Sequence, residues 1–503
     1  MGGVLDILSN LALGLGSAVT FQNLAFCLLG CLLGTLIGVL PGIGAIPTIA
    51  MLLPLTFGMS PLTSLIMLAG IYYGAQYGGS TSAILVRMPG ETSSIVTCLD
   101  GYRMAQQGRA GSALAVAAIA SFFAGCVATV FIAAFGPVLG RFATKFSSPE
   151  YFSLMTLGLV AAVVLANGSV LKAIGMILLG LLLGLAGTDV NSGATRFTFG
   201  FIELQDGIDF VPLALGLFGF AEIMVNLEQK MDNRDAVAAV SKRWPSREEF
   251  RASWPAILRG TSLGSLLGIL PGGGAVLGSF ASYSTEKKLA RDPSRFGQGA
   301  IEGVAGPEAA NNAAAQTSFI PLLTLGIPST PVMALMMGAM VIQGIAPGTL
   351  VMTAKPELFW GMIASMWIAN LFLLVINLPM IGIWIKLLHV PYRLLFPCIV
   401  VFSCLGVYGV NGSTFDVMLT AVLAVAGYVF AKLGCEAAPL ILAFIIGPLM
   451  EENLRRAMVI SDGNPLVFVQ RPISAALLVA TLALFLLIVM PQFRRKRDLA
   501  FQG

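Results

Sequence analysis

Long apolar stretches without any charged residue constrain the fold of this chain more than any other feature. No Asp, Glu, Lys, Arg or His stands between Asp6 and Arg87, and residues 309–354 are equally free of charge. A membrane-spanning helix needs about 20 mostly apolar residues, so the first stretch alone could hold three. A transmembrane β-barrel would instead show short segments of alternating polarity. We therefore predict an all-α polytopic membrane protein.

Charge is scarce in the rest of the chain as well. Charged residues make up 11% of the sequence, against about 25% in an average soluble domain. The apolar stretches predict about 10–12 transmembrane helices. They lie near 22–40, 45–57, 62–86, 112–136, 152–187, 210–226, 256–270, 275–285, 313–326, 331–346, 358–385, 394–410, 414–431, 436–450 and 473–490.

The charged segments indicate how the chain is divided. Residues 227–259 hold seven Lys/Arg and five Asp/Glu, which predicts a cytoplasmic linker between a first membrane half at 1–226 and a second at 260–490. Residues 491–503 include the run Arg494-Arg495-Lys496-Arg497. Because positive charge favours the cytoplasmic side, this end is expected to be a basic cytoplasmic tail.

An internal repeat relates the two halves. Residues 34–45 read GTLIGVLPGIGA and residues 264–275 read GSLLGILPGGGA, so eight of twelve positions are identical. A Gly-Ser-Thr-Ser run at 79–82 and a Gln-Thr-Ser run at 316–318 follow at nearly the same offset, each before a proline. Two ordered matches predict a duplication, and we expect the halves to be inverted relative to each other.

Each half contains a Pro-Gly interruption, which predicts a broken or re-entrant hairpin. Proline lacks an N–H donor and glycine frees the backbone, so the runs 41–44 and 271–274 cannot continue a regular helix. Irregular backbone is tolerated at membrane depth only inside protein or beside a wet cavity. Paired interruptions in two halves point to a transporter's binding site, and kinks packed by neighbouring helices are the alternative.

The site is expected between the two hairpins, where helix N-termini and neutral hydroxyl groups suit an anion. The predicted substrate-binding residues are Pro41, Gly42, Gly44, Gly79, Ser80, Thr81, Ser82, Arg87, Pro271, Gly272, Gly273, Gly274, Thr324 and Ser329. Carbonyl and amide oxygens suit Na⁺. The predicted coupling-ion residues are Asn311, Asn312, Thr317 and Ser318. Tyr72, Gln76 and Thr330 are further polar side chains nearby.

Of three charged residues near this region, Arg87 and Glu308 have two interpretations each and Glu222 has one. Arg87 could contact the anion or extend to the membrane interface. Glu308 is interpreted as a helix cap in preference to a proton carrier. Glu222 stands at the edge of an apolar stretch and is expected at the interface.

Composition also limits the chemistry. The chain has one histidine, His389, so His-rich metal sites are excluded, and no P-loop motif is present. We expect no enzyme activity, no cofactor and no metal beyond a possible coupling Na⁺. The net charge of +4 gives no indication of nucleic acid as a partner. Residues 260–264 match G-x-S-x-G, so an intramembrane serine protease using Ser262 and His389 is a remote alternative. No basic residue precedes Arg87, so no cleaved signal peptide is expected at the N-terminus.

Further motifs run in order over nearly the whole chain. They are GVLPGIG at 38–44, YGGS at 77–80, PGE at 89–91, LDGY at 99–102, QGRA at 107–110, GILPGGG at 268–274, PEAANN at 307–312, IPLLTLGIP at 320–328, PYR at 391–393, GPLMEEN at 447–453 and RP at 471–472. In these motifs the chain resembles the large membrane (permease) subunit of the tripartite tricarboxylate transporter family.

The resemblance implies a multi-pass secondary carrier of the bacterial inner (cytoplasmic) membrane. It implies uptake of citrate and other di- or tricarboxylates, driven by a Na⁺ or H⁺ gradient. It also implies two partners, a small membrane subunit of about four spans and a periplasmic solute-binding protein. The two Pro-Gly hairpins would meet at the substrate, with the 307–312 run beside it. A stand-alone organic-anion carrier without a binding protein is the alternative.

Overall fold

The computed structural model describes residues 2–40, 44–143, 145–165, 169–189, 192–228, 244–270, 274–387 and 392–489. Several predicted features lie outside the described residues: Pro41, Gly42, Pro271, Gly272, Gly273, His389, part of the charged linker (229–243) and the basic tail. The predicted division into two halves joined by a linker therefore stays a prediction.

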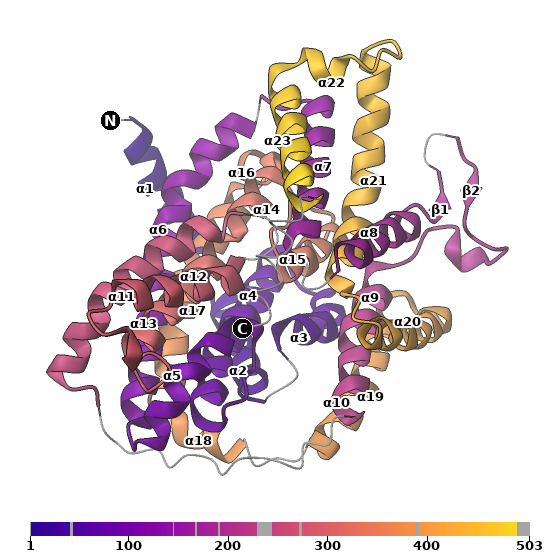
Figure 1. The fold of residues 1–503 in the computed structure, drawn as a ribbon. Helices are drawn as coiled ribbons and strands as arrows, with labels where there is room; N and C mark the ends of the chain where they lie inside the picture. The colour runs from indigo at the N-terminus through magenta and orange to yellow at the C-terminus, as the bar shows by residue number, and fades with distance from the viewer. Residues whose placement is uncertain are drawn as a thin grey trace.

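The described chain is almost entirely helical (Figure 1). Its first part contains α1 (Gly2–Ala18), α2 (Phe21–Val39), α3 (Ala45–Leu52), η1 (Leu53–Thr56), α4 (Pro61–Val86), η2 (Thr92–Ser94), α5 (Ile95–Gln106), α6 (Ala110–Ala143), α7 (Ser148–Leu165), α8 (Val170–Gly184), β1 (Gly187–Thr188), β2 (Thr195–Arg196), η3 (Ile202–Leu204), α9 (Phe210–Ala214), the π-helical η4 (Leu215–Phe220) and α10 (Ala221–Glu228). The strands β1 and β2 form one short antiparallel pair.

The second part of the chain continues with helices only. They are α11 (Arg247–Leu267), α12 (Gly274–Leu289), η5 (Pro293–Arg295), α13 (Glu302–Thr317), α14 (Phe319–Leu325), α15 (Pro331–Ile342), α16 (Thr349–Ala354), α17 (Pro356–Asn377), α18 (Ile381–Leu387), α19 (Tyr392–Asn411), α20 (Thr414–Lys432), α21 (Ala437–Ile460), α22 (Val467–Gln470) and α23 (Pro472–Val489).

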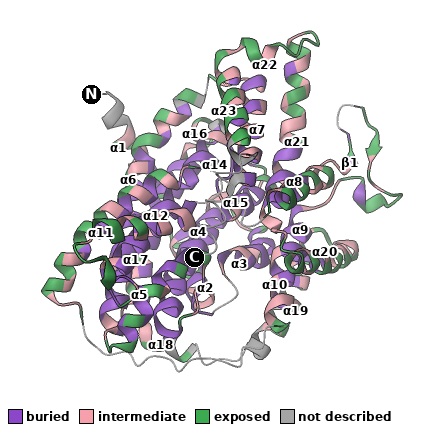
Figure 2. Cartoon of the chain, in the orientation of Figure 1, coloured by how far each residue is buried: buried purple, intermediate pink, exposed green. Residues whose placement is uncertain are grey.

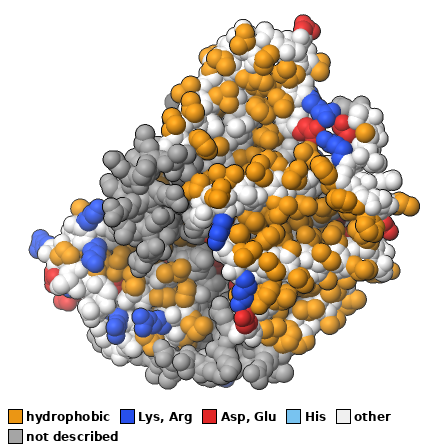
Figure 3. All heavy atoms as spheres, turned by 45° about the vertical axis from the view of Figure 1, so that its right-hand side comes forward, with side chains coloured by type: hydrophobic (Ala, Val, Ile, Leu, Met, Phe, Trp, Pro, Cys, Tyr) orange, Lys and Arg blue, Asp and Glu red, His pale blue; other side chains and the backbone are white. Residues whose placement is uncertain are grey.

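The helices confirm the prediction of an all-α polytopic membrane protein. Among the described residues, six helical segments are long and apolar enough to cross a membrane. They are Phe21–Val39, Ala110–Gly140, Phe210–Glu228, Pro356–Asn377, Thr414–Lys432 and Ala437–Ile460. Hydrophobic side chains spread over the outer face of the molecule in Figure 3. On α20, Met418 is 69% and Val422 65% exposed, so this helix presents a face that suits lipid.

Two helices form the centre of the bundle. Every residue of α4 from Thr63 to Val86 is buried, and every residue of α13 after Glu302 is buried (Figure 2). Both helices contain small and polar residues that would be costly to expose to lipid. Other helices surround both of them, so their polar groups face protein.

The helix pair α2/α4 packs through glycine. A Cβ atom placed on Gly30, Gly34 or Gly38 of α2 would lie 2.2–2.4 Å from a carbonyl oxygen of α4. The backbones of the two helices are therefore in direct contact. Glycines spaced by four residues allow such contact because they fall on one helix face.

The helix pair α11/α13 packs in the same way. A Cβ atom on Gly260 or Gly264 of α11 would lie 2.2 Å from a carbonyl oxygen of α13. A Cβ atom on Gly268, directly after α11, would lie 2.4 Å from another carbonyl oxygen of α13. The glycines at 34 and 38 and those at 264 and 268 occupy equivalent positions in the internal repeat. The repeated sequence thus forms the same type of helix contact twice. Duplication and inversion of whole halves remain predictions.

The interruptions end helices where the sequence predicts. Helix α2 ends at Val39 and α11 at Leu267, directly before the two Pro-Gly runs. The short helix α3 and the helix α12 follow the interruptions. Several elements differ from prediction: α1 and α5 were not expected, and the helix predicted at 313–326 starts at Glu302. Its early turns are rich in Gly, Ala and Asn, so hydropathy alone does not detect them.

Candidate functional site

A cavity of about 710 Å³ lies between the helices that follow the two interruptions. We call it the large cavity. Ile46 of α3 and Ala275 of α12 line it from the two sides, and α4, α7, η2, η4, α10, α20 and α21 supply the rest of the wall. Its hydroxyl, amide and carboxyl side chains are Tyr72, Gln76, Glu91, Thr92, Ser93, Glu222, Ser329, Thr330 and Glu436.

The α3 side of the large cavity is held by Glu91. Gly44 adopts a φ of 65°, which favours glycine, and ends the interruption immediately before α3. The next residue, Ala45, donates its backbone N–H to the Glu91 carboxylate. A carboxylate at a helix N-terminus satisfies an N–H group that has no partner within the helix. A Cβ on Gly79 of α4 would lie 3.0 Å from the Glu91 backbone nitrogen, so Glu91 packs tightly between α3 and α4.

The α12 side has a different arrangement. Ala275, Val276 and Leu277, in the first turn of α12, line the large cavity. No described side chain caps this helix end. Across from it, Ser329 donates to the Ser318 carbonyl at 3.2 Å, and Thr330 caps α15. The first N–H groups of α12 therefore end near hydroxyl groups at the cavity wall.

Hydrogen bonds connect the polar side chains on the α4 side. The hydroxyl of Tyr72 interacts with Gln76, Ser318 and Thr330. Ser93 donates to the amide oxygen of Gln76 at 2.7 Å. These contacts join α4 and η2 to the segment around Thr330. The cavity wall is therefore a connected set of neutral donors and acceptors.

The charges at the large cavity are all acidic among its described lining residues. Glu91, Glu222 and Glu436 line it, and no described Lys or Arg does. Glu222 is half-buried and lines this wall, and its expected place at the interface stays a prediction. Arg87 lies elsewhere, exposed at the C-terminal end of α4 with a left-handed φ of 57°. An anion in this cavity would be bound by neutral groups and helix ends, with a cation needed to balance the carboxylates.

The hydroxyls predicted on α4 and α14 point away from the large cavity. Ser80 donates to Glu308 at 2.6 Å, Thr81 to the Tyr77 carbonyl at 3.3 Å and Ser82 to the Gly79 carbonyl at 3.0 Å. Thr324 bonds the Ile320 carbonyl of its own helix. Bonding to the preceding helical turn is a common structural use of Ser and Thr. Of the predicted substrate residues that are described, Ser329 lines the cavity, and Gly44, Gly79 and Gly274 lie at its edges.

The predicted coupling-ion residues do not form one cluster. Asn312 donates to the Ser121 hydroxyl at 2.7 Å, and Thr317 and Ser318 bond carbonyls of their own helix. Asn311 differs from them, because it is 0% exposed and neither its amide nitrogen nor its oxygen has a partner. Such buried unpaired groups are rare and need an explanation.

Glu308 is the centre of a second polar site. It lies in the second turn of α13, after Glu302 in the first turn, so the interpretation as a helix cap is wrong. Its carboxylate accepts hydrogen bonds from Ser80 at 2.6 Å and Thr97 at 2.5 Å. Ser121 interacts with it as well. A small cavity of about 10 Å³ lies beside it.

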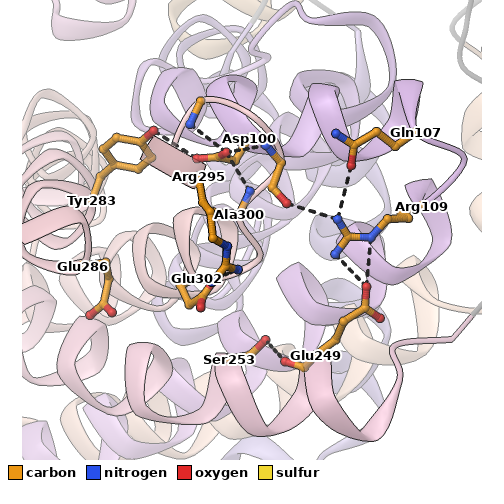
Figure 4. Close-up of polar contacts among 12 residues, drawn as sticks. Asp100, Gln107, Arg109, Glu249, Ser253, Tyr283, Glu286, Arg295, Ala300 and Glu302 are labelled. Carbon is orange, nitrogen blue, oxygen red and sulfur yellow. Dashed lines mark hydrogen bonds and ion pairs between the residues drawn. The ribbon is translucent and has the colours of Figure 1, made fainter. Parts of the chain in front are cut away.

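A set of polar contacts around Asp100 fixes the loop that leads into α13 (Figure 4). Asp100 of α5 is fully buried and accepts the backbone N–H groups of Gly297, Gly299 and Ala300, each at 2.8 Å. The Tyr283 hydroxyl donates to its other oxygen at 3.0 Å. We call this set the Asp100 latch. It joins α5 to the loop that precedes α13, and a carboxylate with this many donors is strongly held.

The ion pair Arg109–Glu249 extends the Asp100 latch. Arg109, at the start of α6, bonds Glu249 of α11 at 2.7 Å and the Gly299 carbonyl at 3.2 Å. Gln107 donates to the Gln298 carbonyl at 2.8 Å. Two motifs, LDGY at 99–102 and QGRA at 107–110, therefore position the second part of the chain. Their sequence positions alone indicate no such contact.

The protease alternative finds no support. Ser262 is exposed within the continuous helix α11 and donates to the Leu258 carbonyl at 2.9 Å. A nucleophile elbow requires a sharp strand-to-helix turn, which is absent at this described position. Its proposed partner His389 lies outside the described residues. The described residues also contain no group of His, Cys, Asp and Glu that could hold a metal ion.

Sequence reasoning missed several lining residues of the large cavity. Glu91, Thr92 and Ser93 follow a proline and lie at the start of the short helix η2, where no periodic pattern indicates their direction. Tyr72, Gln76 and Thr330 were noticed as polar side chains in apolar surroundings but not selected. The signal that could have found them is the rarity of unexplained polar side chains in apolar helices.

Comparison with known proteins places these features in a family. The sequence model of the family described as "Tripartite tricarboxylate transporter TctA family" matches residues 24–442. A protein of Agrobacterium vitis, "Uncharacterized 52.8 kDa protein in TAR-I ttuC' 3'region", is 59% identical over 498 residues, which are 99% of each chain. A second from the same organism, "Uncharacterized protein in TAR-II ttuC' 3'region", is 61% identical over 238 residues, 47% of this chain and 98% of that protein. No solved structure matches.

Proposed function

The chain belongs to the tripartite tricarboxylate transporter TctA family, and we propose that it takes up di- or tricarboxylate anions such as citrate through the large cavity. It is a multi-pass membrane permease of this transporter type. The observation that carries the proposal is the position of the large cavity, between the helices that follow the two interruptions. Transporters bind their substrates at such interrupted helices.

The anion would be held at the α12 side of the large cavity. The first turn of α12, which no described side chain caps, offers backbone N–H groups, and a helix N-terminus carries about half a positive charge. Ser329, Thr330 and Gln76 add neutral polar groups. Neutral donors suit a carrier, because the substrate must later leave. Of the predicted site residues outside the described part, Pro271, Gly272 and Gly273 immediately precede this helix.

The acidic wall supports transport together with a cation. Three glutamates and no described cationic side chain line the large cavity, so an ionised carboxylate entering alone would be repelled. We propose that a Na⁺ or H⁺ gradient drives uptake and supplies this positive charge. The proposed setting is the bacterial inner membrane, with a small membrane subunit and a periplasmic solute-binding protein that delivers the anion.

The test is uptake of radiolabelled di- and tricarboxylates by cells that express the permease with its two presumed partners. Each substrate is measured with Na⁺ and with choline in its place, and again without the binding protein. We expect saturable uptake that requires the binding protein. Uptake that is equal without it would instead indicate the stand-alone carrier. No uptake of any carboxylate by correctly inserted protein would contradict the proposal.

A matched pair of variants tests the site itself. Ser329→Ala removes a hydroxyl at the wall of the large cavity, and Thr324→Ala removes one that bonds its own helix away from it. Loss of one hydrogen bond to a charged substrate is expected to raise the half-saturating concentration about tenfold for Ser329→Ala. Thr324→Ala should transport normally. An equal half-saturating concentration for the two variants would contradict binding of the anion in the large cavity.

A further inference from the structure

The small cavity beside Glu308 lies apart from the large cavity and has a different lining. Its volume is about 10 Å³, close to what a single water molecule or small ion occupies. Among the described residues its polar lining consists of Tyr77, Ser80, Thr81, Ser121, Glu308 and Asn377. The large cavity shares none of these residues. α4, α6, α13 and α17 meet here.

Glu308 is a buried acid without a cationic partner. It is 1% exposed and forms no ion pair in the described part of the chain. Its polar partners are the hydroxyls of Ser80, Thr97 and Ser121. Hydroxyl groups satisfy a carboxylate only in part, and each donating hydroxyl keeps lone pairs of its own. The charge on a buried carboxylate needs a positive counterpart to be stable there.

Two oxygens at the small cavity have no hydrogen-bond partner among the described residues. They are the Tyr77 hydroxyl and the Asn377 Oδ1, on side chains that are 3% and 6% exposed. The amide nitrogen of Asn377 donates to the Leu373 carbonyl at 2.9 Å, so the oxygen is the free end of this amide. Unpaired oxygens of this kind are costly unless something binds them.

These groups form a set of oxygen ligands around a space of ionic size. A carboxylate, an amide oxygen and several hydroxyls are ligands for a hard cation. The one N–H donor side chain in the described lining, that of Asn377, is directed to the Leu373 carbonyl. We propose that the small cavity binds one Na⁺ ion, with Glu308 neutralising it and Asn377 Oδ1 and the Tyr77 hydroxyl completing its coordination.

This inference rests on the proposed function, in which a cation accompanies the anion. It moves the ion site from the predicted group at Asn311, Asn312, Thr317 and Ser318 to Glu308, which lies one helical turn before Asn312 on the same face of α13. Ion binding would connect α13 and α4 to α17. Since α4 also carries Tyr72 and Gln76 at the wall of the large cavity, Na⁺ at Glu308 would fix one of the helices that form this wall.

The test measures ion binding without any carboxylate. The purified full-length protein is placed in lipid nanodiscs in a choline buffer, and equilibrium binding of radiolabelled Na⁺ is followed. We expect saturable binding of one Na⁺ per chain. Glu308→Gln should weaken it about tenfold or more, because it removes the only charged ligand. Asn377→Leu should weaken it about threefold to tenfold, the effect of one neutral ligand.

Two control variants are matched to these. Glu302→Gln makes the same change on the same helix, at a residue paired with Arg295. Asn370→Leu removes another buried amide of α17 that lines neither cavity. Both should bind Na⁺ like the wild type. All variants are first shown to be monodisperse by size-exclusion chromatography.

The outcomes separate the two proposals. Absence of saturable Na⁺ binding to the wild type, or equal binding by wild type and Glu308→Gln, overturns the ion site, even when carboxylate uptake is intact. Na⁺ binding that depends on Glu308 in a protein that transports no carboxylate supports the ion site and contradicts the proposed substrate. If Glu308→Gln fails to fold, Asn377→Leu against Asn370→Leu decides the question.

Discussion

The helix pairs α2/α4 and α11/α13 pack through the same spacing of glycines, yet they differ in their content of charged residues. No charged residue lies in α2 or α4. Helix α13 contains two glutamates and three amide side chains, and α11 contains charged residues including Arg259, which pairs with Glu286 at 2.6 Å. One way of packing thus supports a pair without charged residues and a pair that contains them. Close backbone contact depends on residue size, whereas the other faces of each helix are free to differ.

The two helices that follow the interruptions, α3 and α12, also differ from each other. Helix α3 has 8 residues and its first N–H is bound by Glu91. Helix α12 has 16 residues and no cap from a described side chain. One helix end is therefore neutralised by the protein itself, and the other, which no described side chain caps, is where we propose that the anion binds. The predictions below test where the two pairs are equivalent and where they differ.

The largest effect is expected from filling the glycine contacts. Gly34→Val and Gly264→Val each place side-chain atoms where a carbonyl oxygen lies 2.2 Å from the Cβ position. Both should lower stability by about 4 kcal/mol or more and abolish folded protein. Fluorescence-detected size-exclusion chromatography after heating measures this. Gly16→Val, with nothing within 4 Å, is the control. If Gly264→Val yields folded protein of wild-type stability, only the α2/α4 pair depends on close backbone contact.

A smaller but severe effect is expected at the Asp100 latch. Asp100→Ala leaves three buried backbone N–H groups and the Tyr283 hydroxyl without their acceptor. The expected loss is about 3 kcal/mol or more of folding free energy. Thermal unfolding of the purified protein measures it, with the exposed residue Asp292 changed to Asn for comparison. Wild-type stability of Asp100→Ala would mean that α13 is positioned without the latch.

The two helix ends should respond differently to loss of Glu91. Glu91→Ala removes the cap of α3, an effect of about 1–2 kcal/mol. Amide hydrogen exchange in residues 45–50 should therefore accelerate roughly 5- to 30-fold. Exchange in residues 276–281 of α12 should stay unchanged, because that helix has no such cap. Equal acceleration in both helices would erase the proposed difference between them.

The smallest effect concerns pH at the Arg109–Glu249 pair, which lies at the charged start of α11 outside the candidate spans. Burial raises the pKa of Glu249, but the Ser246 N–H and Arg109 outweigh it, and the pKa is lowered overall. A lowered pKa in the folded state gives stability above the unfolded pKa of about 4.3, and this stability is lost as the pH falls through the folded value. Wild type should exceed Glu249→Gln by about 1 kcal/mol at pH 7 and by less near pH 4. A difference in unfolding temperature that does not depend on pH would contradict this.

The sequence predicted features that are local or periodic. Apolar stretches located most helices, and the Pro-Gly runs located the ends of α2 and α11. The contacts of Glu91, Asp100 and Glu308 were not predicted, because each joins segments far apart in the chain. Glu308 shows the reason most clearly. Its place before Asn311 suggested a cap, but the helix starts at Glu302, and the direction of a side chain inside a helix depends on neighbours that sequence spacing does not reveal.

The complete burial of α13 has a consequence for biosynthesis. Its sequence includes Glu308, and a charged residue at the centre of an inserting helix costs about 2.5–3.5 kcal/mol on translocon scales. Contact with lipid does not offset this free-energy cost, since the residues of this helix after Glu302 face protein. The segment must therefore enter the bilayer together with partners that are already there. Helices α4, α5 and α6, which contact α13, are translated earlier, so part of its binding surface exists before this helix is synthesised.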